Sequence, residues 1–252
     1  MSPQKLGVIP LLKTLREVRG SSAAPRPIVV DGAPALVPVV AKALRAGGDA
    51  SLVREGGDPS HASALVWVGE PDLERLRAAT RARVPIVGVT SGESLPYVLD
   101  TDIVAAAPGR PAPVDEVAAR RAARLDQEGP RLAARLPVLR EALVDELFRR
   151  YARRNGLIGV AVWMPGLDMP ILTLNQLRLV LQIAIAHGHE VDSSRLPEVL
   201  GVVGAGFGFR AIARQLLAAV PIAGWAMKGA VAYTGTKAVG EAARRRFEAA
   251  RT

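Results

Sequence analysis

The stretch PIVVDGAP, residues 27–34, is a short apolar run that ends in a turn. An apolar run of this length, followed by Gly and Pro, predicts a buried strand and then the start of a helix. We expect the helix to start within Asp31–Pro34 and to continue to about Arg45, because Gly47 and Gly48 follow as helix terminators. The segment therefore predicts one β–α unit of an α/β fold.

The same alternation of strands and helices continues to about residue 128. Further strands are expected, in chain order, at 50–53, 64–68, 84–89 and 102–106. Helices are expected at 72–82, where Asp72 is the N-cap, and at 114–125. Because apolar strands that alternate with helices imply a parallel sheet covered on both faces, we predict a small Rossmann-like domain.

From Pro130 onward the sequence predicts helices only. A long amphipathic helix is expected over 132–154, followed by uncharged residues at 157–164 and a Pro- and Gly-containing break. More helices are expected at 171–186, 200–220 and 222–250. We therefore divide the chain into an N-terminal helix and linker (1–23), an α/β domain (24–128) and a domain of helical hairpins (130–252).

The basic charge of the chain is concentrated in this helical half. The 252 residues carry a net charge of +9, and residues 130–252 alone carry 17 Lys and Arg against 9 Asp and Glu. Basic charge combined with apolar helices favours an anionic lipid surface over nucleic acid, and an aromatic content of 4% leaves few platforms for base stacking. We expect a membrane surface or a helical partner protein, a homo-oligomer, and no nucleic acid.

Composition also narrows the chemistry. The chain has no cysteine, which excludes disulfides and thiolate metal sites, and we expect no metal and no cofactor. The first residues lack the layout of a signal peptide, so we expect a cytoplasmic, membrane-associated protein.

Two stretches of the helical half, PGLDMPILTLNQLRLVLQIAIAHG (165–188) and GVVGAGFGFRAIARQLLAAVPIAGWAMKGAVAYTGTKAVGEA (201–242), carry a resemblance to a known family. The region of about 130–250 resembles the YcjF-like family, a helical domain of unknown function that often follows Era-type GTPase domains and is often described as membrane-associated. This resemblance implies a GTPase-type domain in front of the helices. It assigns no catalytic residue.

The α/β half resembles such a GTPase domain that has lost its chemistry. A GTPase places G-x-x-x-x-G-K-[ST] after its first strand, whereas Asp31–Pro34 offers neither the lysine nor the hydroxyl that bind phosphate and magnesium. Val66–Gly69 lacks the aspartate of D-x-x-G, and Thr90–Glu93 stands in place of the guanine-reading N-K-x-D. We therefore expect a degenerate, non-enzymatic GTPase-like domain.

An alternative is a nucleotide-binding sensor or enzyme. Asp31 and Gly32 follow the first strand, and Thr90 and Ser91 follow the fourth. Open α/β sheets bind ligands beyond the carboxyl ends of their strands, so these four residues mark a candidate pocket.

The candidate interface lies in the helical half. Its residues are the arginines before the uncharged segment, two tryptophans and a G-x-x-x-G pair, namely Arg149, Arg150, Arg153, Arg154, Trp163, Trp225, Gly204 and Gly208. Small residues allow close helix approach, and arginines beside an apolar segment suit a membrane or partner surface. A solvated helix face, a tightly packed bundle and a soluble adaptor that docks a separate GTPase remain alternatives.

Other polar residues of this half have structural interpretations. We expect Asn175 and Gln176 to form hydrogen bonds between helices. His187 and His189 are expected at a helix C-terminus, with zinc binding as the alternative.

Overall fold

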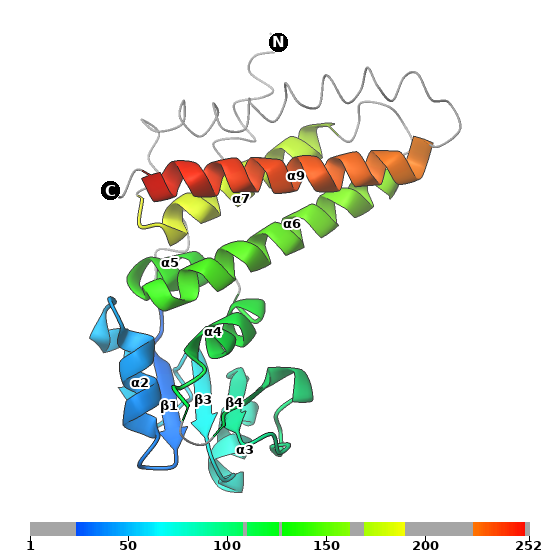
Figure 1. Ribbon diagram of the computed structural model, residues 1–252. Helices are drawn as coiled ribbons and strands as arrows, with labels where there is room; N and C mark the ends of the chain where they lie inside the picture. The colour runs from blue at the N-terminus through cyan, green and yellow to red at the C-terminus, as the bar shows by residue number, and fades with distance from the viewer. Residues whose placement is uncertain (1–23, 108–109, 126–127, 162–168, 190–223, 250–252) are drawn as a thin grey trace. The chain divides into compact units, whose positions relative to one another are not determined.

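The computed structural model describes residues 24–107, 110–125, 128–161, 169–189 and 224–249 (Figure 1). The chain divides into an α/β unit, residues 23–143, and a helical unit that contains the described residues from Val144 onward. The division falls between Leu143 and Val144, whereas the sequence pattern predicts a change at Pro130.

The α/β unit is built on a five-stranded, wholly parallel sheet, which confirms the predicted fold class. The strands pair in the order β2-β1-β3-β4-β5. Their bounds are Ile28–Gly32 (β1), Val53–Glu55 (β2), Ala64–Val68 (β3), Ile86–Thr90 (β4) and Ile103–Ala105 (β5). β2 lies on one side of β1, whereas β4 and β5 continue the sheet on the opposite side, beyond β3. The direction in which successive strands are added therefore reverses between β1 and β3. In doubly wound sheets of this order, the reversal is where ligands bind.

Helices cover both faces of the sheet. α3 (Leu73–Arg81) packs Leu76 and Ala79 into a buried cluster with Val29 and Trp67. α2 (Val37–Arg45) packs on β1 and β2 and contacts α4 (Val114–Ala123). Right-handed crossovers place α2 and α3 on opposite faces, because the two connections leave β1 and β3 in opposite directions.

Some strand boundaries in this unit differ from the expected ones, because 3-10 turns precede β2 and β5. Residues 50–52 are not part of the strand expected at 50–53: Asp49 caps a 3-10 turn, η1 (Ala50–Leu52), by accepting from the Ser51 amide at 2.9 Å, and β2 begins at Val53. The turn forms here in place of a strand, despite the apolar pattern, because the hydrogen bond that caps it is made between residues close together in the sequence. A second turn, η2 (Asp100–Asp102), likewise precedes β5.

The single long helix expected over 132–154 is also wrong. The chain instead forms α5 (Gly129–Arg135), the 3-10 turn η3 (Pro137–Leu139) and α6 (Arg140–Ala161). Pro137 has no backbone N–H and restricts the residue before it, so the helix ends there.

The short helix α5 belongs to the α/β unit because of its contacts. The Asp49 amide donates to the Arg135 carbonyl at 2.8 Å, and the two side chains also form an ion pair. Leu132, Leu136 and Leu139 are fully buried.

The helical unit consists of α6 from Val144 onward, α7 (Met169–Ala186) and α9 (Gly224–Ala249). α7 and α9 pack along each other (Figure 1). α6 and α9 approach closely at a pair of glycines: a Cβ on Gly229 would lie 3.1 Å from the Gly156 carbonyl oxygen and 2.6 Å from Val160. Small residues thus mediate helix contact here, at positions other than the predicted ones.

A buried polar network joins these three helices. Asn175 donates to the Asn155 side-chain oxygen at 2.8 Å, and Gln176 donates to Thr236 Oγ1 at 3.5 Å. The prediction that Asn175 and Gln176 bond between helices is therefore confirmed. None of the helices in the described ranges combines the length and apolar composition needed to cross a bilayer.

Candidate functional site

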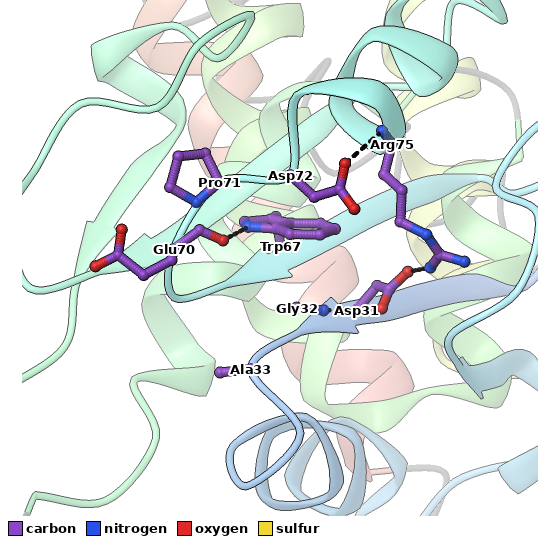
Figure 2. Close-up of a pocket in the computed structure, with 8 residues that line it drawn as sticks. All are labelled: Asp31, Gly32, Ala33, Trp67, Glu70, Pro71, Asp72 and Arg75. Carbon is purple, nitrogen blue, oxygen red and sulfur yellow. Dashed lines mark hydrogen bonds and ion pairs between the residues drawn. The ribbon is translucent and has the colours of Figure 1, made fainter.

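A cavity of about 390 Å³ opens at the carboxyl ends of β1 and β3, where the strand order reverses (Figure 2). Its lining comes from the end of β1, the end of β3 and the first turn of α3, and consists of Asp31, Gly32, Ala33, Trp67, Glu70, Pro71, Asp72 and Arg75. The cavity therefore occupies the position that open parallel sheets use for small ligands.

Two glycines hold the ends of β1 and β3 close together, and one of them, Gly32, lines the cavity. Gly32 has φ +123°, and a Cβ there would lie 2.1 Å from the Val68 carbonyl oxygen. That oxygen accepts from the Ala33 amide at 2.7 Å, which ties the two strand ends together. Gly69 has φ +88°, and a Cβ there would lie 3.0 Å from Ala33. Only glycine fits such conformations at such short distances.

Asp31 and Arg75 form an ion pair in the wall of the cavity (Figure 2). The Asp31 side chain is 17% exposed and the Arg75 side chain 43% exposed. Asp31 also accepts from the Gly32 amide at 2.9 Å, so the carboxylate is held in place by its own backbone. Asp31 was predicted from the sequence, whereas Arg75 was not, because nothing in the sequence distinguishes it from the other arginines of α3.

The remaining wall is built around Trp67. Its indole Nε1 donates to the Glu70 carbonyl oxygen at 2.8 Å, which fixes the turn that leads into α3. Asp72 caps α3, as predicted, by accepting from the Glu74 and Arg75 amides at 3.0 and 3.2 Å. Some of the amides at the N-terminus of α3, which have no partner within the helix, therefore donate to the Asp72 side chain.

Thr90 and Ser91 do not line this cavity. Thr90 Oγ1 donates to the Glu93 carbonyl at 2.9 Å and accepts from the Gly92 amide at 3.1 Å, so its hydroxyl stabilises a local turn. Ser91 is exposed after β4, on the far side of β3 from Asp31. Of the four predicted pocket residues, the structure brings only Asp31 and Gly32 together.

A second candidate site, here called the basic face, lies on α6 and α9. It consists of exposed cations on α6 and one on α9, namely Arg149, Arg150, Arg153, Arg154 and Lys237. Positions three and four apart share one side of a helix, so the four arginines form one stripe. Lys237 lies 5.9 Å from the centre of the Tyr233 ring, in cation–π contact.

Apolar side chains continue the basic face. Leu157 is 66% exposed, Val160 46% and Tyr233 39%. Tyr233 belongs with the α6 stripe because a Cβ on Gly156 would lie 3.5 Å from the Tyr233 Cβ. The arginines were predicted from the sequence, whereas Leu157 and Tyr233 were not, because their exposure near the close contact of Gly156 and Gly229 depends on tertiary packing.

The charges of the basic face are incompletely compensated. Glu146 pairs with Arg149 at 3.2 Å and lies 3.7 Å from Arg150. Arg153 and Arg154 form no ion pair with any acidic side chain that the structure describes. Burial raises the pKa of the nearby Tyr151 phenol, so this group stays neutral and adds no negative charge.

Three of the predicted interface residues, Trp163, Gly204 and Gly208, lie outside the described residues. Trp225 lies in the first turn of α9, and its side chain is also outside the described part.

The two histidines have structural partners. His187 is buried, with Nδ1 at 2.8 Å from the Ile183 carbonyl oxygen, and His189 packs against the Phe247 ring. Within the described ranges no group of three or more His, Asp or Glu side chains could hold a metal ion.

No family model, curated protein or solved structure matches this chain. The assignment of function therefore rests on the residues and geometry of the cavity and the basic face.

Proposed function

We propose that this chain is a non-catalytic scaffold that attaches to anionic membrane surfaces through the basic face of α6 and α9. The observation that carries the proposal is the position of Arg153 and Arg154, without an acidic partner among the described residues, directly beside exposed Leu157 and Val160. Cations next to exposed apolar side chains match the interface of a lipid bilayer, where phosphates lie above hydrocarbon.

Two contributions favour binding. Each Lys or Arg near an anionic leaflet contributes about 1 kcal/mol. The basic face carries five cations, of which Arg149 and Arg150 lie near the carboxylate of Glu146. Leu157, Val160 and Tyr233 add apolar area that would leave water on contact with the acyl boundary. Stable attachment generally takes two such contributions together.

The geometry suits helices that lie along the surface. The α6 stripe runs parallel to its helix axis, and long arginine side chains can reach phosphates while their stems cover apolar area. The charge excess of residues 130–252 and their resemblance to the YcjF-like family are consistent with this proposal. No catalytic step is assigned, because Asp31–Pro34 lacks the phosphate-binding lysine and hydroxyl of a GTPase.

Vesicle co-sedimentation tests the proposal. The full chain is mixed with vesicles of phosphatidylcholine plus phosphatidylserine, or of phosphatidylcholine alone, at low and high salt. We expect binding only to the anionic vesicles, weakened but not abolished by salt because the apolar part is not screened. The Arg153→Glu/Arg154→Glu variant should stay in the supernatant.

A matched control changes the same charge elsewhere. Arg77→Glu/Arg81→Glu replaces two exposed arginines of α3 and should pellet like the unmodified chain. Equal loss in both double variants would mean that net charge rather than the basic face drives binding. No binding of the unmodified chain would reject the membrane proposal and favour a helical partner protein or a GTPase as the occupant.

A further inference from the structure

The cavity at the ends of β1 and β3 presents opposite charges to whatever enters it. The Asp31 carboxylate is largely buried, and a buried carboxylate is stable only with a compensating partner, which Arg75 supplies. The Asp31 side chain is fixed by the Gly32 amide, whereas Arg75 reaches the cavity on a long, more exposed side chain. A ligand can therefore displace Arg75 more easily than Asp31.

Phosphate finds few donors here. The Gly32 amide is bonded to Asp31, the Ala33 amide to the Val68 carbonyl, and the Gly69 amide to the Val89 carbonyl. Pro34 has no amide donor, and Asp72 accepts from the amides at the start of α3. Phosphate sites at strand ends rely on such amides being free, so this edge is not built for a nucleotide.

The charge balance of the lining points to a ligand that carries a cation. Glu70 directs its carboxylate away from the Asp31–Arg75 pair, so Asp31 and Asp72 contribute two carboxylates against one guanidinium, that of Arg75 (Figure 2). An anion alone would add to this negative excess and leave Asp31 without its partner. A cation alone would leave Arg75 without a partner. A zwitterion compensates both groups at once.

We infer that the cavity binds a free α-amino acid, with its ammonium group on the Asp31 carboxylate and its carboxylate on the Arg75 guanidinium. An α-amino acid carries its ammonium and carboxylate groups on the same carbon atom, so its two charges are close enough together to contact the two side chains of the Asp31–Arg75 pair at once. The guanidinium can hold a carboxylate through two parallel hydrogen bonds. The volume of about 390 Å³ leaves room for a side chain against Trp67 and Pro71.

The first test uses the full chain with the twenty L-amino acids as probes in a thermal-shift assay, followed by titration calorimetry of the best one. We expect saturable binding of at least one amino acid. Its analogue without the amino group and its analogue without the carboxylate should each bind at least about tenfold more weakly, because each leaves one charged wall group uncompensated. The inference would be overturned if no amino acid bound, or if the best amino acid bound no more tightly than both of its analogues.

The second test uses variants. Asp31→Asn and Arg75→Gln should each weaken binding of the same amino acid by at least about tenfold, while Arg77→Gln, an exposed arginine of α3 outside the cavity, should bind like the unmodified chain. Unchanged binding in Asp31→Asn and Arg75→Gln would place the amino acid elsewhere and overturn the inference. Should either variant unfold, the analogue series with the unmodified chain decides the question. Tighter binding of adenosine monophosphate than of any amino acid would also overturn it.

Discussion

Asn155 of α6 donates a hydrogen bond from Nδ2 to Oγ1 of Thr236 in α9, with a distance of 2.9 Å, and both side chains are fully buried. Thr236 Oγ1 in turn donates to the Ala232 carbonyl at 2.7 Å within its own helix. One hydroxyl thereby satisfies an amide group of a neighbouring helix and fixes the rotation of α9 relative to α6. The basic face depends on this rotation, because it places Tyr233, with Lys237 over its ring, next to Gly156 of α6.

Removal of that hydroxyl should destabilise the helical unit. Thr236→Val keeps the shape but leaves the buried Asn155 amide without its acceptor, and we expect a loss of about 1–3 kcal/mol in the free energy of unfolding. Thr234→Val is the matched control: Thr234 is exposed on the same helix and bonds only to carbonyls of that helix. Denaturant unfolding should give a change of less than about 0.5 kcal/mol for the control. Similar losses in both variants would contradict a role for the network.

The close contact between Gly32 at the end of β1 and Val68 at the end of β3 gives a second prediction. Gly32→Ala forces a Cβ to within 2.1 Å of the Val68 carbonyl oxygen, and the backbone of a central strand cannot move away cheaply. We expect a loss of roughly 2 kcal/mol or more in stability. Gly57→Ala is the control, since Gly57 also has a positive φ, of 93°, but no atom lies within 4 Å of a Cβ there. Thermal unfolding of the two variants measures the difference. An equal fall in both melting temperatures would contradict the close contact between the ends of β1 and β3.

The ion pairs of Glu241 predict how the stability of the fold changes with pH. Hydrogen bonds from Arg245 and Arg244, at 3.0 and 3.1 Å, lower the pKa of Glu241 below its ordinary value of 4.5. A carboxylate whose pKa is lower in the folded chain stabilises the fold above the unfolded pKa, and loses this effect as the pH falls through the folded pKa. Glu241→Gln should therefore reduce stability at neutral pH, by at most about 1 kcal/mol for a partly exposed pair.

The difference between Glu241→Gln and the unmodified chain should be constant above roughly pH 5 and shrink towards zero below roughly pH 4. Glu116→Gln serves as control, because Glu116 is exposed on α4 and takes part in no ion pair within the described part of the chain. Melting curves across this pH range measure the difference. A destabilisation by Glu241→Gln that persists unchanged at acid pH would show that the carboxylate charge is not its cause.

The parts of the fold that sequence predicted best are those in which local pattern and burial agree. β3 and β4 are buried along their whole length, so their apolar runs identified them, and Asp72 identified the start of α3 through its own capping bonds. The break at η3 was missed because 132–154 keeps a helical apolar pattern on both sides of Pro137, although α5 lies wholly in the α/β unit and α6 enters the helical unit at Val144. Helical periodicity carries no information about which core a helix segment joins.

The candidate sites show the same limit. Asp31 and Gly32 could be chosen from sequence because the end of a first strand is a recurrent ligand position. Arg75, however, reaches the cavity only through the register of Asp31 with Trp67 and the packing of α3 beside them. Thr90 has a comparable position at a strand end, but β4 lies beyond β3 and its hydroxyl is used within its own turn.

Insertion of the basic face into a bilayer is measured most directly by a fluorophore at Leu157. The chain has no native cysteine, so Leu157→Cys labelled with nitrobenzoxadiazole reports from this position alone, and labelled Ser91→Cys reports from the α/β unit as a control. Addition of phosphatidylserine-containing vesicles should shift the emission of the Leu157 label to shorter wavelength and leave the Ser91 label unchanged. A Leu157 label that stays in an aqueous environment while the chain pellets with the vesicles would contradict attachment through this face.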